Sequence, residues 1–203
     1  MKGPDSALNA TASSTLPPGV ELLPDYVSPD DEHNLLSLVD SGVWSTELAR
    51  RVQHFGYRYD YRKRSVDPSM CLGSLPPMLQ AVANRLVEEL LFDRPPDQVI
   101  VNEYLPGQGI AAHVDCEPCF GPVIASLSLF APVIIAFANK RTREVVEVDL
   151  PHRSLLVLSG EGRYGWTHSI PARKTDMVDG ALRQRMRRVS LTFRTMILNP
   201  PAR

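Results

Sequence analysis

The sequence predicts a mainly β fold with flanking helices, either an antiparallel sandwich or a small barrel. From residue 99 onward, short segments rich in β-branched residues alternate with loops that contain glycine, proline or charged residues. Before residue 99, two segments instead carry the caps or the three- and four-residue apolar spacing of helices. A chain of 203 residues is long enough for one well-buried domain, which we expect over residues 20–203.

Residues 1–19 are rich in serine, threonine, alanine and proline. Such a segment buries too little apolar surface to offset the entropy of ordering it, so we expect a flexible tail. It lacks the basic-then-apolar pattern of an export signal, and no apolar run approaches the length needed to span a bilayer. We therefore expect a cytoplasmic protein, or a nuclear one if its source is eukaryotic.

Two helices are predicted before residue 99. Ser28 and Pro29 supply a cap and a first helical residue, and the two aspartates that follow place acids in the first turn. This start predicts a helix that ends near Ser41. Residues 75–92 predict a second helix because apolar residues recur at helical spacing. They are Leu75, Met78, Leu79, Val82, Leu86 and Leu90.

Six strands are predicted in the rest of the chain. They cover residues 99–105, 124–129, 133–138, 144–150, 155–158 and 188–197. The sequence contains no internal repeat and no linker that would divide off a second domain.

The triplet His113-Val114-Asp115 is a candidate half of a metal site. Side chains two apart on a strand share a face, so His113 and Asp115 can converge on one ion while Val114 turns into the core. Two neutral imidazoles and one carboxylate suit Fe(II) with open coordination positions, whereas structural zinc would be closed by thiolates or further imidazoles. His168, after a glycine-rich loop, is the candidate second imidazole, although its residue type alone leaves that role open.

The last predicted strand has one polar face that carries two arginines. Arg188 and Arg194 share this face with Ser190 and Thr192, and three apolar residues occupy the other face. Such a pattern is typical of a strand that lines a charged cavity. Because forked guanidinium groups hold carboxylates in a defined plane, it predicts an anionic ligand such as a small dicarboxylate.

Residues 50–64 form a basic and aromatic segment with the single acid Asp60. Basic side chains can hold phosphates while aromatic faces stack an unpaired base, which predicts a nucleic-acid substrate. The candidate contacts are Arg51, Phe55, Tyr57, Arg58, Tyr59 and Tyr61. The alternative interpretation is a solvated hairpin whose tyrosines cover the sheet.

The net charge of -1 argues against a protein that coats long duplexes, but local positive patches suffice for a short or single-stranded substrate. An enzyme that acts on a base must flip it out of a duplex or find it unpaired. We therefore expect single-stranded DNA, a flipped base or a transfer-RNA loop as the partner, and a monomeric protein.

Three cysteines do not make a disulfide framework, and their odd number fits a reducing compartment. Cys116 and Cys119 form a CxxC motif directly after Asp115. Because no second pair completes a zinc site, we expect two loop cysteines beside the metal site that are open to oxidation.

Four segments resemble the AlkB family of Fe(II)- and 2-oxoglutarate-dependent dioxygenases. They are NEYLPGQGIAAHVD, IASLSL, SLLVLSGEGRYGWTH and RVSLTFR, and the resemblance extends over residues 50–195. The segment RRVQHFGYRYDY is most like the AlkB-type domain of the eukaryotic transfer-RNA wobble-uridine modifying protein. The resemblance implies a double-stranded β-helix, or jelly roll, with its core at residues 99–197 and a nucleotide-recognition lid at residues 50–65.

The resemblance also implies roles for individual residues. The implied iron ligands are His113, Asp115 and His168, and the implied 2-oxoglutarate contacts are Asn102, Tyr104, Arg188, Ser190 and Arg194. Arg188 is expected to pair with the distal carboxylate, and Arg194 to lie near the iron. The family often has Asn where this chain has Ser190, so a side-chain amide is not expected to help hold the cosubstrate.

The implied activity is oxidative demethylation of alkylated DNA or RNA bases. Fe(II), 2-oxoglutarate and O2 would yield succinate and CO2, and a hydroxylated N-methyl group would leave as formaldehyde. Three alternatives stay open. They are a hydroxylase of a modified wobble uridine in transfer RNA, a hydroxylase or demethylase of protein side chains, and a non-catalytic nucleic-acid-binding jelly roll.

Overall fold

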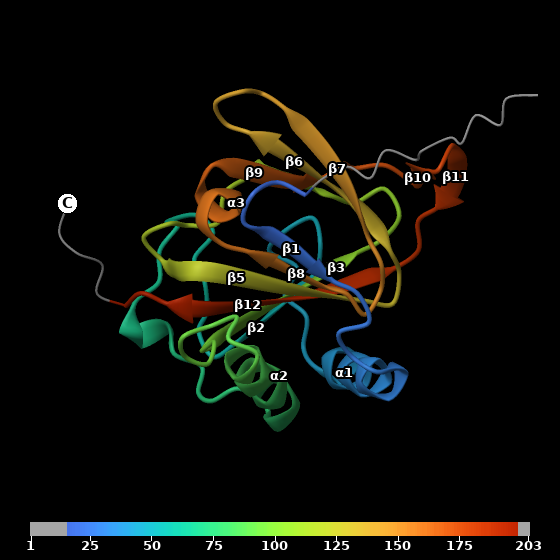
Figure 1. The fold of residues 1–203 in the computed structure, drawn as a ribbon. Helices are drawn as coiled ribbons and strands as arrows, with labels where there is room; N and C mark the ends of the chain where they lie inside the picture. The colour runs from blue at the N-terminus through green and yellow to red at the C-terminus, as the bar shows by residue number, and fades with distance from the viewer. Residues whose placement is uncertain (1–15, 199–203) are drawn as a thin grey trace, which may run out of the picture.

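The computed structural model describes residues 16–198 as two facing antiparallel sheets with two helices on the outer face of the larger sheet (Figure 1). The large sheet has the strand order β1 (Val20–Leu23), β8 (Leu155–Leu158), β5 (Phe120–Leu129), β12 (Arg188–Met196), β3 (Gln98–Tyr104) and β2 (Val52–Phe55). The small sheet has the order β4 (Ile110–His113), β9 (Trp166–Ile170), β6 (Val133–Asn139) and β7 (Val145–Leu150). The predicted jelly roll is confirmed.

The remaining elements surround this core. A hairpin of β10 (Thr175–Val178) and β11 (Ala181–Gln184) precedes β12. A 3-10 helix (Pro68–Met70) and a short helix α3 (Gly160–Tyr164) lie in connections. In the described part of the chain, no helix is long and apolar enough to cross a membrane.

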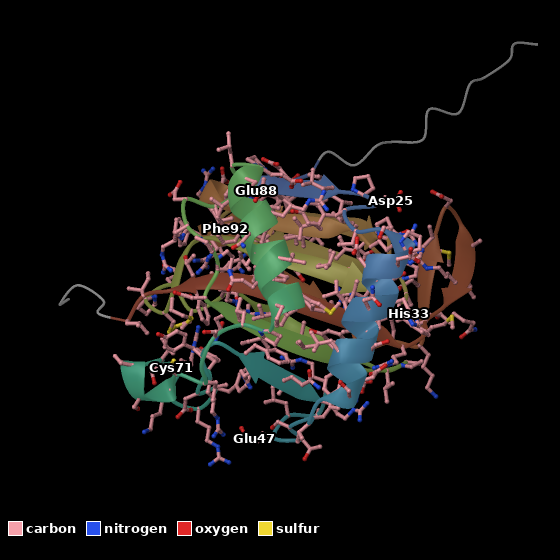
Figure 2. All side chains as sticks on the ribbon, turned by 90° about the horizontal axis from the view of Figure 1, so that it is seen from below. Asp25, His33, Glu47, Cys71, Glu88 and Phe92 are labelled. Carbon is pink, nitrogen blue, oxygen red and sulfur yellow. A yellow bond between two sulfur atoms is a disulfide. The ribbon has the colours of Figure 1, made fainter. Side chains whose placement is uncertain are left out.

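Two apolar clusters explain why the large sheet is buried on both faces. The first cluster joins the large sheet to α1 (Pro29–Ser41) and α2 (Pro77–Glu88), which lie across it in Figure 2. Val189, Leu191 and Phe193 of β12 point into this cluster. The second cluster fills the space between the sheets. The polar face of β12 is therefore turned inward, toward the small sheet, as its alternation predicts.

The helix starts follow their local chemistry. The Ser28 hydroxyl accepts from the Asp31 amide at 3.1 Å, and an Asp31 oxygen accepts from the Ser28 amide at 3.3 Å, which completes the cap of α1. Helix α2 is shorter than predicted because Pro77 occupies its first turn. Leu90 is also 92% exposed with a φ of 60°, so the apolar stripe ends at Leu86.

The six predicted strands correspond to β3, β5, β6, β7, β8 and β12, although β5 begins at Phe120 rather than residue 124. The other strands and α3 were not predicted, because each is only four or five residues long and most of these strands pair with segments far away in the chain.

Of the predicted tail, residues 1–19, the first fifteen residues lie outside the described part of the chain. Leu16 packs against the cluster between the sheets, and the carbonyl oxygen of Gly19 accepts from the Ser159 amide at 2.8 Å. Leu16 and Gly19, which fall within the expected tail, therefore contact the folded domain.

We expect His54 on β2 to make the stability of the fold depend on pH. Its Nε2 is buried without a partner among the described residues, and burial, aided by the Arg58 and Arg194 charges, lowers its pKa to about 4. The unfolded chain binds this proton near pH 6.5, so we expect stability to fall as pH drops from 6.5 toward 4, by at most about 1.4 kcal/mol per pH unit.

Urea midpoints measured across this pH range for the protein and His54→Gln test that expectation. The variant should lose stability less steeply, and equal slopes would rule out the His54 contribution.

Candidate active site

A cavity of about 440 Å³ lies between the two sheets and beneath the lid segment. Strands β12 and β3 of the large sheet form one wall, and β4, β6 and β9 form the other. Its polar lining residues are Asn102, Tyr104, His113, Asp115, Ser126, His168, Arg188, Ser190, Thr192 and Arg194, joined at the lid by Arg50, Tyr59, Tyr61 and Arg64. Most of the other lining side chains are aliphatic.

The structure brings His113, Asp115 and His168 together in this cavity. One ligand atom from each lies within 4.8 Å of the others. His113, the last residue of β4, pairs directly with His168 of β9, and their ring centroids are 4.4 Å apart. Asp115 follows the end of β4, and its Oδ2 lies 3.6 Å from His168 Nε2. This donor set fits Fe(II) with coordination positions left open.

The position of Val114 differs from the one predicted from the sequence. It lines the cavity instead of turning into the core. The reason is that β4 ends at His113, so strand alternation no longer applies to the next two residues.

The charges around Asp115 favour its carboxylate form. Burial by itself would raise the pKa of Asp115, but the nearby positive charge, above all the guanidinium of Arg194, outweighs it, so the pKa lies below its usual range. Arg194 Nη2 lies 2.5 Å from Asp115 Oδ1. Burial lowers the pKa of His168 to about 4, which leaves a neutral imidazole at neutral pH, as metal binding requires.

Arg188 lies at the other end of the polar face of β12 and is only 4% exposed. Its Nη2 donates to Ser128 Oγ at 2.8 Å, and its guanidinium lies 5.5 Å from the Tyr104 ring centroid. Within residues 16–198, Nε and Nη1 have no hydrogen-bond partner and no carboxylate forms a salt bridge with this group. Burial lowers its pKa to about 10. A buried cation with unused donors fits the carboxylate of a small anion such as 2-oxoglutarate.

The other three candidate cosubstrate residues also line the cavity. Asn102 and Ser190 are directly paired on neighbouring strands. Asn102 Oδ1 accepts from Arg50 Nε at 2.9 Å, so its oxygen is already used by the lid. The guanidinium groups of Arg50 and Arg188 lie 5.8 and 5.5 Å from the centroid of the Tyr104 ring.

The candidate substrate residues separate into two groups. Tyr59 and Tyr61 line the cavity, with ring centroids 5.1 Å apart. Phe55 packs against the cluster beneath the helices, and Tyr57 packs against the cluster between the sheets without lining the cavity. For these two residues the structure therefore matches the alternative interpretation, in which lid aromatics cover the sheet.

The two candidate arginines of the lid are held by carboxylates outside the cavity. Arg51 Nε and Nη2 donate to the buried Glu103 at 2.6 and 2.8 Å. Arg58 pairs with Glu47 at 2.6 Å on the surface. The lid arginines that do line the cavity are Arg50 and Arg64, whose place in the basic segment was the only sequence signal for them.

The CxxC motif lies at the metal site, where the sequence placed it. The sulfur atoms of Cys116 and Cys119 are bonded to each other, and both lie 3.3 Å from the Arg64 carbonyl oxygen. This disulfide joins residues three apart and is not a framework between elements. Cys71 is the free cysteine of the described chain.

Comparison with known proteins places this site in a family. The chain matches the 2OG-Fe(II) oxygenase superfamily over residues 19–194. It is 37% identical to the tRNA (carboxymethyluridine(34)-5-O)-methyltransferase alkbh8 of Xenopus tropicalis, over 93% of this chain and 33% of that protein. It is 38% identical to the Alkylated DNA repair protein ALKBH8 homolog of Arabidopsis thaliana, over 90% of this chain and 60% of that protein.

A viral protein and a solved structure extend the comparison. The protein L905 of Acanthamoeba polyphaga mimivirus is 36% identical over 88% of this chain and 85% of its own length. The structure of OsALKBH1 matches with a TM-score of 0.67 at 21% identity, and the match covers 89% of this chain and 98% of that one. This last likeness concerns the fold alone.

The superfamily match covers most of the chain, although the chain spans only part of the frog and Arabidopsis relatives. The donor set of the cavity agrees with that match, because it combines an open iron site with a buried arginine suited to a dicarboxylate. The chain therefore belongs to the 2OG-Fe(II) oxygenase superfamily, as an AlkB-like dioxygenase that uses Fe(II), 2-oxoglutarate and O2.

Proposed function

We propose that this dioxygenase oxidises a carbon of a modified base in an unpaired nucleotide. The observation that carries the proposal is the lid face of the cavity, where Tyr59, Tyr61, Arg50 and Arg64 line the same space as the candidate metal ligands. Aromatic faces suit a base that has left its stack, and arginines suit the phosphates that flank it.

The residues of the cavity would have three separate roles. His113, Asp115 and His168 would hold the iron, and Arg188 would pair with the distal carboxylate of 2-oxoglutarate. Bound Fe(II) supplies the oxidation chemistry, in which 2-oxoglutarate and O2 become succinate and CO2 and one oxygen atom enters the substrate C–H bond. Aliphatic side chains such as Ile135 and Leu156 exclude water from the site.

Between the two nucleic-acid substrates, we favour a modified wobble uridine of transfer RNA over an alkylated DNA or RNA base. The supporting observation is the 37% identity to a protein whose name refers to carboxymethyluridine 34 of transfer RNA. Demethylation remains the second candidate, because the Arabidopsis relative is named for repair of alkylated DNA. The two reactions differ only in what the hydroxylated carbon is attached to.

A direct assay separates these substrates. The iron-loaded protein is incubated with 2-oxoglutarate in air and with either transfer RNA or single-stranded oligonucleotides that carry N-methylated bases. A mass gain of one oxygen on a uridine supports the first candidate, and loss of a methyl group with release of formaldehyde supports the second. Activity on peptides alone would refute the nucleic-acid proposal.

Tyr61→Ala tests the lid. Stacking on an aromatic side chain is worth about 1–3 kcal/mol per base, so we expect KM for the nucleic-acid substrate to rise about tenfold or more. The affinity for 2-oxoglutarate should not change. Tyr57→Leu is the matched control, because Tyr57 belongs to the same segment but does not line the cavity. Equal KM values for the two variants would contradict the role of Tyr61.

A further inference from the structure

Arg163 is a buried cation that the chemistry above does not use. It lies in α3, is 2% exposed, and is the largest of the fully buried side chains. Its Nη1 donates to the carbonyl oxygen of Asp115 at 3.0 Å, and its Nη2 to the carbonyl oxygen of Cys116 at 3.5 Å. Over residues 16–198, Nε has no partner and no carboxylate forms a salt bridge with the guanidinium.

Such a group is costly to bury. A guanidinium removed from water without a carboxylate loses hydration that two carbonyl oxygens replace only in part. The other buried arginines of the described chain differ: Arg185 pairs with Asp176, Arg194 pairs with Asp115, and Arg188 faces the cavity. The guanidinium of Arg163 instead donates to the carbonyl oxygens of a candidate iron ligand and of the residue that follows it.

The backbone that carries Arg163 is firmly held. The Arg163 amide donates to the Ser159 carbonyl oxygen at 3.1 Å, and the Ser159 amide donates to Gly19 at 2.8 Å. Gly162 lies so close to Gly19 that an added Cβ would be 2.7 Å from Gly19 backbone atoms. Helix α3 is thus fixed against the residues before β1, and it leads directly into β9, which carries His168 (Figure 1).

The backbone of Asp115, unlike that of Arg163, is not held within a helix or strand. It lies beyond the end of β4, and the pairing of β4 with β9 is irregular before it stops at His113. No strand register therefore fixes the Asp115 backbone, although the Arg194 guanidinium of β12 holds its carboxylate at 2.5 Å. The Arg163 guanidinium holds this loop from α3. It thereby links the backbone at Asp115 to the helix that leads into β9, which carries His168.

We propose that Arg163 is a positioning residue, which holds the peptide groups of Asp115 and Cys116 so that the Asp115 carboxylate points to the same metal ion as His113 and His168. This inference rests on the metal role proposed for Asp115.

Binding of Co(II), followed by its visible absorption, tests the inference without turnover. Arg163→Met removes the donors while keeping a long side chain, and we expect the dissociation constant for Co(II) to rise about tenfold or more, with an altered spectrum. Arg163→Lys should restore part of the affinity. If Arg163→Met does not fold, Arg163→Gln replaces it with the same expectation.

Leu79→Ala is the control for lost stability, because Leu79 is a fully buried residue of α2 that packs against the large sheet and does not line the cavity. It should lower the urea midpoint yet bind Co(II) as the unmodified protein does. Wild-type affinity and spectrum in a folded Arg163→Met or Arg163→Gln protein would overturn the inference. Asp115→Ala separates the two claims: if it still binds Co(II) normally, the metal site itself is wrong, and the positioning role falls with it.

Discussion

His113→Ala is expected to abolish Fe(II) binding and 2-oxoglutarate turnover while the protein stays folded. The side chain supplies one of three ligands to an open site, so its loss leaves only two protein ligands. In the absence of metal, the side chain of His113 makes one hydrogen bond within the described residues, between Nδ1 and the Ala111 carbonyl oxygen at 2.8 Å, so the free energy of unfolding should fall by no more than about 1 kcal/mol. Iron content and succinate release measure the first effect, and urea unfolding the second.

His33→Ala is the matched control, because His33 is an exposed residue of α1 on the far side of the large sheet (Figure 2). Retained iron and turnover in His113→Ala would contradict the metal role. Asp115→Ala is a poorer test of the same claim. It leaves the buried Arg194 without its carboxylate, so loss of stability would accompany loss of iron.

Arg188→Met is expected to raise KM for 2-oxoglutarate by roughly 100-fold, because about 3 kcal/mol is lost when one partner of a buried charge pair is removed. The same change should leave the stability of the ligand-free protein unchanged or higher. In that state Arg188 is a buried cation with two unused donors, and an apolar side chain removes their desolvation cost. Weaker ligand binding without a loss of stability would indicate that Arg188 serves to bind the ligand and not to stabilise the fold.

Arg187→Met provides the control at the neighbouring position. Arg187 pairs with Glu103 and Asp40 outside the cavity, so its loss should lower stability and leave KM for 2-oxoglutarate unchanged. Thermal unfolding with and without the cosubstrate measures both effects. An unchanged KM in Arg188→Met would refute the proposed contact with the distal carboxylate.

The parts of the site that could be predicted are those that depend on local periodicity. On β12, Arg188 and Arg194 line the cavity because alternation places every second residue on one face. The spacing of His113 and Asp115 also indicated convergence, although Asp115 lies just beyond the strand. His168 had no local signal, since it meets His113 through pairing of strands that are more than fifty residues apart in the chain.

The lid shows why the substrate contacts could not be assigned from sequence. Strand β2 ends at Phe55, and Gly56 turns the chain with a φ of 76°, in a place where a Cβ would collide with the Asp97 carbonyl oxygen. Face alternation is lost at this turn, so the pattern could not separate Tyr59 and Tyr61 from the aromatic residues before them. Arg51 pairs with Glu103, which lies far along the sequence, so no local pattern indicated this partner.

A crystal structure of the protein with Fe(II) and a 2-oxoglutarate analogue, grown without oxygen and measured at the iron absorption edge, tests the central claim most directly. We expect one anomalous peak about 2.0–2.2 Å from an imidazole nitrogen of His113 and of His168 and from a carboxylate oxygen of Asp115. The distal carboxylate of the analogue should contact the Arg188 guanidinium. Iron bound elsewhere, or an analogue turned away from Arg188, would contradict the account.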